Sequence, residues 1–140
     1  MVKATYLAQL GRYVEWLDRA EPRPAQPRLC IWQPSADFHT ALIALAASPT
    51  ARQVEIVSDG EQINRQPEAC HIIYAGHQLS TLLRVPRNTL IVSDDVSDHH
   101  ATLIFVTRQQ RLSFVINLSR AREQRLRLSS KLLALASEVR

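Results

Sequence analysis

The chain opens with an apolar pattern of helical period. Apolar side chains recur at spacings of three and four residues, at Leu7, Leu10, Val14 and Leu17. This spacing predicts an amphipathic helix over residues 3–18, within an N-terminal segment 1–21. Prolines follow at positions 22, 24 and 27, and because proline cannot continue a helix, residues 22–27 are predicted to be a short connector. We expect the helix to pack on the core, and its apolar stripe is also one candidate surface for a dimer.

Short apolar runs then alternate with helical patterns. Strands are predicted over residues 28–32, 53–57, 70–75 and 89–92, and helices over residues 36–47 and 79–84. Ser35 can cap the first of these helices, and Pro49 follows its end. Alternation of this kind is typical of a parallel sheet with right-handed crossovers and helices on both faces.

The last third follows a different pattern. Residues 102–107 and 112–116 are predicted to form an antiparallel hairpin, joined by the stretch 108–111. Asn117 can cap a short helix over 118–125, and Ser129 can cap a final helix whose apolar face is Leu132, Leu133, Leu135, Ala136 and Val139. Residues 1–140 are therefore predicted to form one α/β domain, with a mainly parallel central sheet, a C-terminal antiparallel hairpin and helices on both faces.

Composition excludes several classes of protein. With 46% apolar and 21% charged residues in 140, the chain is typical of a globular domain. It has no run of eighteen apolar residues, so we expect no direct membrane insertion. Among three glycines, neither GxGxxG nor GxxxxGK[ST] occurs, which argues against a phosphate-binding loop. The start of the chain lacks the apolar block of a secretory signal, so either the protein is cytoplasmic or a signal has been removed ahead of it.

The side chains that could carry chemistry lack the spacing that chemistry needs. The possible metal ligands are Cys70, His71, His77 and the pair His99–His100. Cys70 and His71 are neighbours in a predicted strand, so their side chains leave opposite faces of it. The sequence contains neither of the ligand spacings CxxC and HxxxH. We therefore expect no metal site. Cys30 and Cys70 both lie in apolar runs, where burial suppresses thiol reactivity, so we expect no catalytic cysteine. Composition alone leaves their redox state open.

Two charged regions suggest alternative functions. Asp94 and Asp95 follow a predicted strand and are interpreted as a solvated turn, because neither Lys3 nor Lys131 lies where a phospho-acceptor domain needs a lysine. A small cytoplasmic α/β enzyme or phospho-acceptor domain using this pair remains the alternative. Residues 108–140 hold eight basic and two acidic side chains, whereas the whole chain has a net charge of +4. Only Phe105 and Phe114 accompany these arginines, in strand patterns facing a core, so we expect no nucleic-acid binding.

A more specific pattern closes the chain. Residues 114–122 read F-V-I-N-L-S-R-A-R, and residues 126–136 read L-R-L-S-S-K-L-L-A-L-A. This pattern resembles the closing signature of the YfiR family of small periplasmic regulators, F-x-I-N-L followed by a short Ala/Arg helix and L-x-[LI]-S-S-x-L-L-x-L-A. The signature residues here are Asn117, Arg122, Leu126, Ser129, Ser130, Leu132 and Leu133. Weaker similarities at 13–16, 29–31, 69–74 and 90–94 extend the resemblance over nearly the whole domain.

The resemblance implies a non-enzymatic role without a cofactor. Such proteins bind the periplasmic sensory region of an inner-membrane diguanylate cyclase and repress it, and so control cyclic di-GMP and biofilm formation. It further implies a homodimer, a periplasmic location with the signal segment removed, and a disulfide between Cys30 and Cys70 in that oxidising compartment. Two features depart from the family: residues 99–104 replace a Gly-Met-Ile segment, and a second, late cysteine pair is missing.

Overall fold

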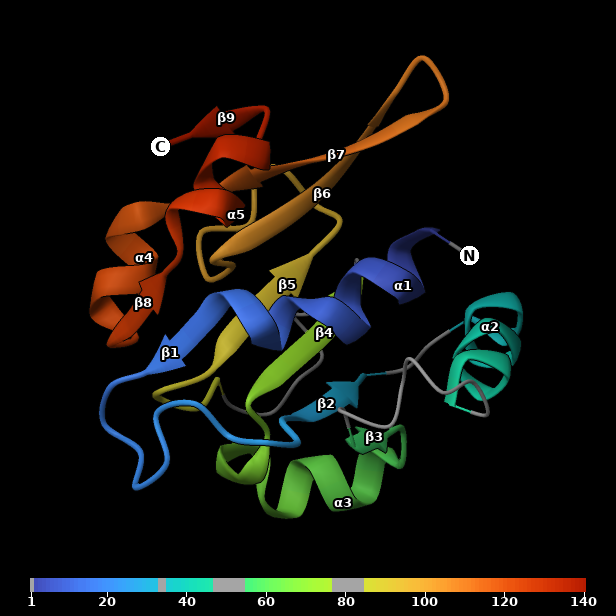
Figure 1. Ribbon diagram of the computed structural model, residues 1–140. Coiled ribbons are helices and arrows are strands. Elements are labelled where there is room, and N and C mark those ends of the chain that lie inside the picture. The colour runs from blue at the N-terminus through green and yellow to red at the C-terminus, as the bar shows by residue number, and fades with distance from the viewer. Residues whose placement is uncertain (1, 33–34, 47–54, 77–84) are drawn as a thin grey trace.

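The computed structural model describes residues 2–32, 35–46, 55–76 and 85–140 (Figure 1). A seven-stranded sheet forms its centre, in the order β3-β2-β4-β5-β6-β7-β9. Its strands are β2 (Arg28–Ile31), β3 (Glu55–Val57), β4 (Ile72–Gly76), β5 (Leu90–Ser93), β6 (Leu103–Arg108), β7 (Arg111–Ile116) and β9 (Glu138–Val139). A separate two-stranded sheet pairs β1 (Val14–Trp16) with β8 (Leu126–Leu128).

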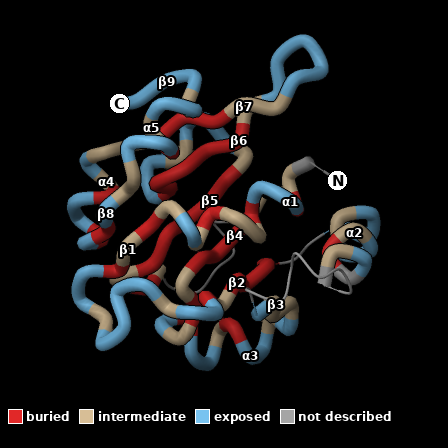
Figure 2. The backbone as a smooth tube through the Cα atoms, in the orientation of Figure 1, coloured by how far each residue is buried: buried red, intermediate tan, exposed pale blue. Residues whose placement is uncertain are grey.

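The direction of the strands confirms the predicted α/β class. All pairs from β3 through β2, β4 and β5 to β6 are parallel, and β6 and β7 form the expected antiparallel hairpin. Gln109 and Gln110 both have positive φ, of 51° and 64°, so the hairpin closes in a two-residue turn. The pairing extends to Arg108 and Arg111, and the hairpin tip projects from the body as an exposed arm (Figures 1 and 2).

Helices lie on both faces of the sheet, as predicted. The larger core packs strand residues such as Ile72 and Phe114 against α1 (Val2–Gln9), α2 (Ala36–Ala46), α4 (Leu118–Glu123) and α5 (Ser130–Leu135). On the other face, Ile73 and Ile91 pack with Ile63 of α3 (Gly60–Arg65). Asp59 caps α3, accepting a hydrogen bond from the Glu61 amide at 3.0 Å. A 3₁₀ turn, η3 (Pro67–Ala69), leads from α3 toward β4.

The predicted N-terminal helix over 3–18 is wrong beyond Gln9. The chain continues as a 3₁₀ turn, η1 (Leu10–Tyr13), and then as β1. Gly11 lies against Pro27 so closely that a Cβ there would come within 2.5 Å of the Pro27 Cγ, and the next residues pair with β8. The apolar stripe nevertheless faces the core. Three of its four residues are buried within this chain, namely Leu7, Leu10 and Val14, and Leu17 is exposed, at 38%. The stripe is therefore not available as a dimer surface.

The C-terminal elements follow the predicted caps. Asn117 accepts a hydrogen bond from the Arg120 amide at the start of α4, and Ser129 accepts one from Leu132 at the start of α5, both at 3.2 Å. Both C-terminal helices are shorter than predicted. α4 ends at Glu123, the chain reverses through Arg125 with a φ of 57°, and β8 separates the two helices. Val139 lies in β9 rather than on the last helix, and Leu135 is exposed.

Several predictions fall outside the described residues, namely the helix over 79–84, Pro49, His77 and the first residues of the strand predicted at 53–57. Within the described part of the chain, no helix is both long enough and apolar enough to cross a bilayer.

Candidate functional site

The acidic pair after β5 consists of Asp94, which is largely buried, and Asp95, which is exposed. Asp94, whose side chain is 12% exposed, accepts a hydrogen bond from the Tyr74 hydroxyl and lies 3.1 Å from the Lys3 ammonium. Burial, together with the Asp94 contact, raises the pKa of Tyr74 above its usual value. Lys3 lies far from this pair in the sequence, and not after a late strand as a phospho-acceptor domain requires, but α1 brings it to Asp94 from the start of the chain.

Asp95 completes the local turn. Its carboxylate accepts hydrogen bonds from the amide and the hydroxyl of Ser97, at 3.0 and 2.7 Å. Asp95 is exposed, as a solvated turn requires, whereas Asp94 is not. Because the Asp94 carboxylate is engaged by Tyr74 and Lys3 at the carboxyl end of β5, the geometry favours a structural tie between α1, β4 and β5 over a phospho-acceptor.

His71 is held as a neutral hydrogen-bond acceptor. Its Nδ1 accepts the Arg28 amide at 3.0 Å, and its carbonyl accepts the Trp16 indole N–H at 3.0 Å. Burial, together with the positive charges of Arg19 and Arg28, lowers the pKa of His71 to about 4. Among the described residues, no three His, Cys, Asp or Glu side chains gather as a metal site would need.

The pKa of His71 predicts a pH dependence of stability. Below pH 6.5 the imidazole of the unfolded chain takes up a proton, whereas the folded one does so only near pH 4. The contribution of His71 to the free energy of unfolding should therefore fall as the pH decreases from about 6.5 to about 4. His71→Asn offers the Arg28 amide a non-titrating acceptor. In urea unfolding at about pH 7 and about pH 4.5, wild type should lose more stability than this variant, and equal losses would contradict the assignment.

The two cysteines form a disulfide. Cys30 lies within β2 and Cys70 lies two residues ahead of the neighbouring strand β4, and their Cα atoms are 5.9 Å apart. Both side chains are buried on the face covered by α3. The bridge therefore ties together the ends of a 40-residue crossover that contains α2, β3 and α3.

Most signature residues build the fold rather than a surface. Asn117 and Ser129 cap helices, while Leu126, Leu132 and Leu133 pack into the larger core. Arg122 and Ser130 are the exposed members. Packing and capping do not account for these two side chains, which makes them candidates for a functional role.

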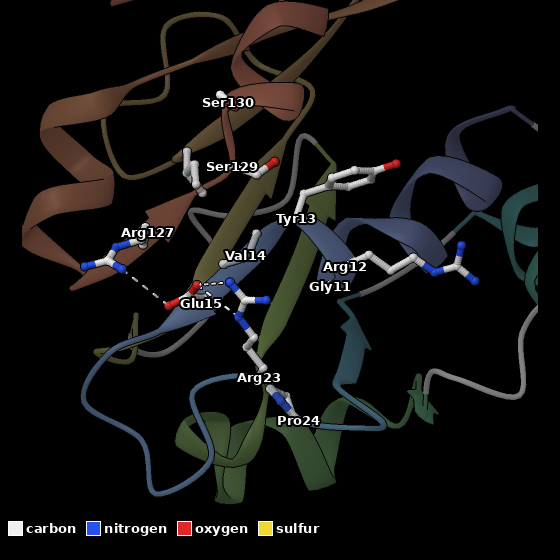
Figure 3. Close-up of a pocket in the computed structure, with 11 residues that line it drawn as sticks. Gly11, Arg12, Tyr13, Val14, Glu15, Arg23, Pro24, Arg127, Ser129 and Ser130 are labelled. Atoms are coloured by element: carbon white, nitrogen blue, oxygen red, sulfur yellow. Dashed lines mark hydrogen bonds and ion pairs between the residues drawn. The ribbon is translucent and has the colours of Figure 1, made fainter.

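Ser130 borders a groove beside the two-stranded sheet (Figure 3). The groove has a volume of about 490 Å³, and the residues with polar side chains that line it are Arg12, Tyr13, Glu15, Arg23, Arg127, Ser129 and Ser130. It forms where η1 and β1 meet β8 and the start of α5, with the proline-rich connector on its far side. Segments from the two ends of the chain thus build one surface. Sequence periodicity missed it because it depends on the pairing of β1 with β8.

A carboxylate lies between two guanidinium groups in this groove. Glu15 accepts hydrogen bonds from Arg23, one of them from Nε at 2.9 Å, and its other oxygen lies 3.8 Å from Nη1 of Arg127 (Figure 3). The hydrogen bond from Arg23 and the charges of both arginines lower the pKa of Glu15. The Glu15 side chain is 19% exposed, whereas those of Arg23 and Arg127 are 80% and 68% exposed. The groove therefore presents more positive than negative charge to solvent.

The other arginines of the basic C-terminal third are spread over several surfaces. Ion pairs join Arg120 to Glu123, Arg125 to Asp18 and Arg140 to Glu138. Phe105 and Phe114 are buried in the core, as their strand pattern predicted, and offer no exposed ring for stacking on a base.

Comparison with known proteins identifies the family. The model of the YfiR/HmsC-like family matches residues 1–137. The chain belongs to this family. No curated protein matches the chain.

Solved structures support the fold of this family member. One match is the crystal structure of a conserved domain protein from Vibrio cholerae O1 biovar El Tor, with a TM-score of 0.57 and 12% sequence identity. The alignment covers 82% of this chain but only 55% of that one, so the chain spans about half the length of the structure that it matches. At this identity the likeness concerns the fold alone.

Proposed function

We propose that this chain binds the periplasmic sensory region of an inner-membrane diguanylate cyclase and holds the cyclase inactive. The match to the YfiR/HmsC-like family over residues 1–137 carries the proposal. Release of the cyclase would raise cyclic di-GMP and favour biofilm growth. The protein acts in this scheme through protein–protein contact, with no cofactor.

The geometry is compatible with a binding role. The two carboxylates that could have served an enzyme are engaged by other side chains. Asp94 is bound by Tyr74 and Lys3, and Asp95 accepts a hydrogen bond from Ser97. The buried disulfide suits a protein of the oxidising periplasm. An open, arginine-lined groove offers a surface on which a partner could dock.

The test is a pull-down followed by an activity measurement. The chain is used as bait against the purified periplasmic regions of the inner-membrane diguanylate cyclases of its host. We expect one of these regions to be retained, and the full-length cyclase in membrane vesicles to produce less cyclic di-GMP when the chain is added. Retention of none of them, or retention without loss of cyclase activity, would contradict repression by direct contact.

We also propose that the protein is a homodimer, as the family resemblance implies. The stripe of Leu7, Leu10 and Val14 is already buried within one chain, so a dimer would use another surface. Sedimentation equilibrium at working concentration should give twice the chain mass, and a monomer mass would contradict this.

A further inference from the structure

We propose that the groove beside β1 and β8 is the surface that receives the partner, and that its occupant is a carboxylate-rich segment of the cyclase's periplasmic region. The inference rests on the proposed function and adds to it the location and the charge of the contact.

Charge is the first argument for this occupant. Arg12, Arg23 and Arg127 line the groove, and Glu15 is its one acidic lining residue. Two of these arginines extend most of their side-chain surface into solvent. A surface with this excess of positive charge attracts an acidic segment and disfavours a basic one, which supplies both steering and specificity.

Glu15 shows how a carboxylate is held in the groove. It is bound from two sides, by Arg23 and by Arg127 (Figure 3). A guanidinium has five N–H donors, and Arg23 uses only Nε and Nη2 for Glu15. The remaining donors of these two exposed arginines can bind further carboxylates in the same manner. Because Glu15 holds Arg23 by hydrogen bonds, fewer rotamers of that side chain are lost when the partner binds.

The origin of the lining residues is the second argument. Ser129 and Ser130 are residues of the closing signature, which carries the family resemblance most specifically, and Arg127 lies between signature residues at a position where the signature accepts any residue. Ser129 is occupied in capping α5, whereas Ser130 is exposed at the groove and has a hydroxyl to offer a ligand. The signature thus places one exposed hydroxyl, that of Ser130, on the same rim as the exposed guanidinium of Arg127.

The experiment compares two charge-matched double variants. Arg23→Gln with Arg127→Gln removes two positive charges from the groove without placing a new acid beside Glu15. Arg108→Gln with Arg111→Gln removes the same charge from the exposed hairpin tip. The affected ion pairs are exposed, so both variants should fold, which thermal melting verifies. Affinity for the retained cyclase region is measured by surface plasmon resonance at low and high salt.

We expect the groove variant to bind at least about tenfold more weakly and with a shallower salt dependence, and the hairpin variant to stay within about twofold of wild type. Equal weakening by the two variants, or no weakening by the groove variant, would overturn the assignment of the groove. A purely structural role for Arg23 and Arg127 would lower the melting temperature without changing the salt dependence.

A second probe separates this inference from the proposed function. If no cyclase region binds, the proposed function fails, and titration of the chain with hexaglutamate in NMR decides the chemistry of the groove. Amide signals of Val14, Glu15 and Ser130 should then shift, with hexalysine causing no such shifts. Shifts confined to other surfaces, or none, would overturn the groove as a carboxylate-binding site.

Discussion

Reduction of the Cys30–Cys70 bridge is expected to lower the free energy of unfolding by about 4 kcal/mol. The bridge closes a loop of 40 residues, and the chain-entropy relation gives about this value for such a loop. The effect arises mainly in the unfolded chain, which becomes free to separate β2 from β4. Urea unfolding with and without a reductant measures it, because reduction keeps both sulfur atoms in place and changes only the covalent link.

The loss of stability on reduction should be largest within the crossover that the bridge closes. This segment contains β3, an edge strand of three residues paired on one side only, and α3, a helix of six. Hydrogen exchange in α2 and α3 should therefore accelerate on reduction more than in β6 and β7, which lie outside the loop. The Cys30→Ala, Cys70→Ala variant provides a second route, with an additional cost for the volume of the two buried sulfur atoms.

Thiol counting checks the premise of this prediction. Native protein purified without reductant and then unfolded should show no titratable thiol, since both cysteines are bonded to each other. Two thiols per chain would contradict the bridge. Unchanged stability on reduction would contradict its structural role.

The sequence predicted the central sheet well because its strands are locally encoded. Residues 29–32 and 90–92 are apolar throughout, and strands covered on both faces need this composition. The hairpin, the cap at Asn117 and the cap at Ser129 are also local, since a cap joins residues only a few positions apart. Each of these features could be predicted without knowledge of the rest of the chain.

The two-stranded sheet could not be predicted in this way. Val14–Trp16 has helical spacing relative to Leu7 and Leu10, and three residues are too few to show an alternating pattern. Its strand conformation depends on pairing with Leu126–Leu128, more than a hundred residues away. The contact of Gly11 with Pro27, just after the end of α1, is also non-local.

The candidate site shares this limitation. The signature indicated that residues 126–133 matter, but not that Arg127 and Ser130 would line one groove together with Arg12 and Arg23. Likewise, no local pattern connected Lys3 to Asp94. Side chains that meet only through long-range pairing require the structure, and both the groove and the Lys3–Asp94–Tyr74 contact are of this kind.

Trp16 is one of the residues that join the two sheets, and Trp16→Ala is expected to cost about 3–5 kcal/mol of stability. Its side chain is fully buried in the larger core, its ring meets the His71 imidazole edge-on with centroids 5.2 Å apart, and its indole N–H binds the His71 carbonyl at 3.0 Å. Truncation would leave a large cavity between β1 and the start of β4. Chemical unfolding, with circular dichroism as the signal, measures the loss.

Two further variants separate the contributions of the ring and of its neighbourhood. Trp16→Phe keeps an aromatic ring and loses the indole donor, but the His71 carbonyl keeps its bond from the Leu90 amide, so the cost should be only about 1–2 kcal/mol. Leu17→Ala, at the adjacent exposed position, should change stability by less than about 0.5 kcal/mol. Val14 and Glu15 line the groove and lie in β1 beside Trp16. Because the ring of Trp16→Phe should keep β1 in place, this variant should also retain binding at the groove. A loss for Trp16→Ala no larger than that for Leu17→Ala would show that β1 is not anchored to the sheet through this side chain.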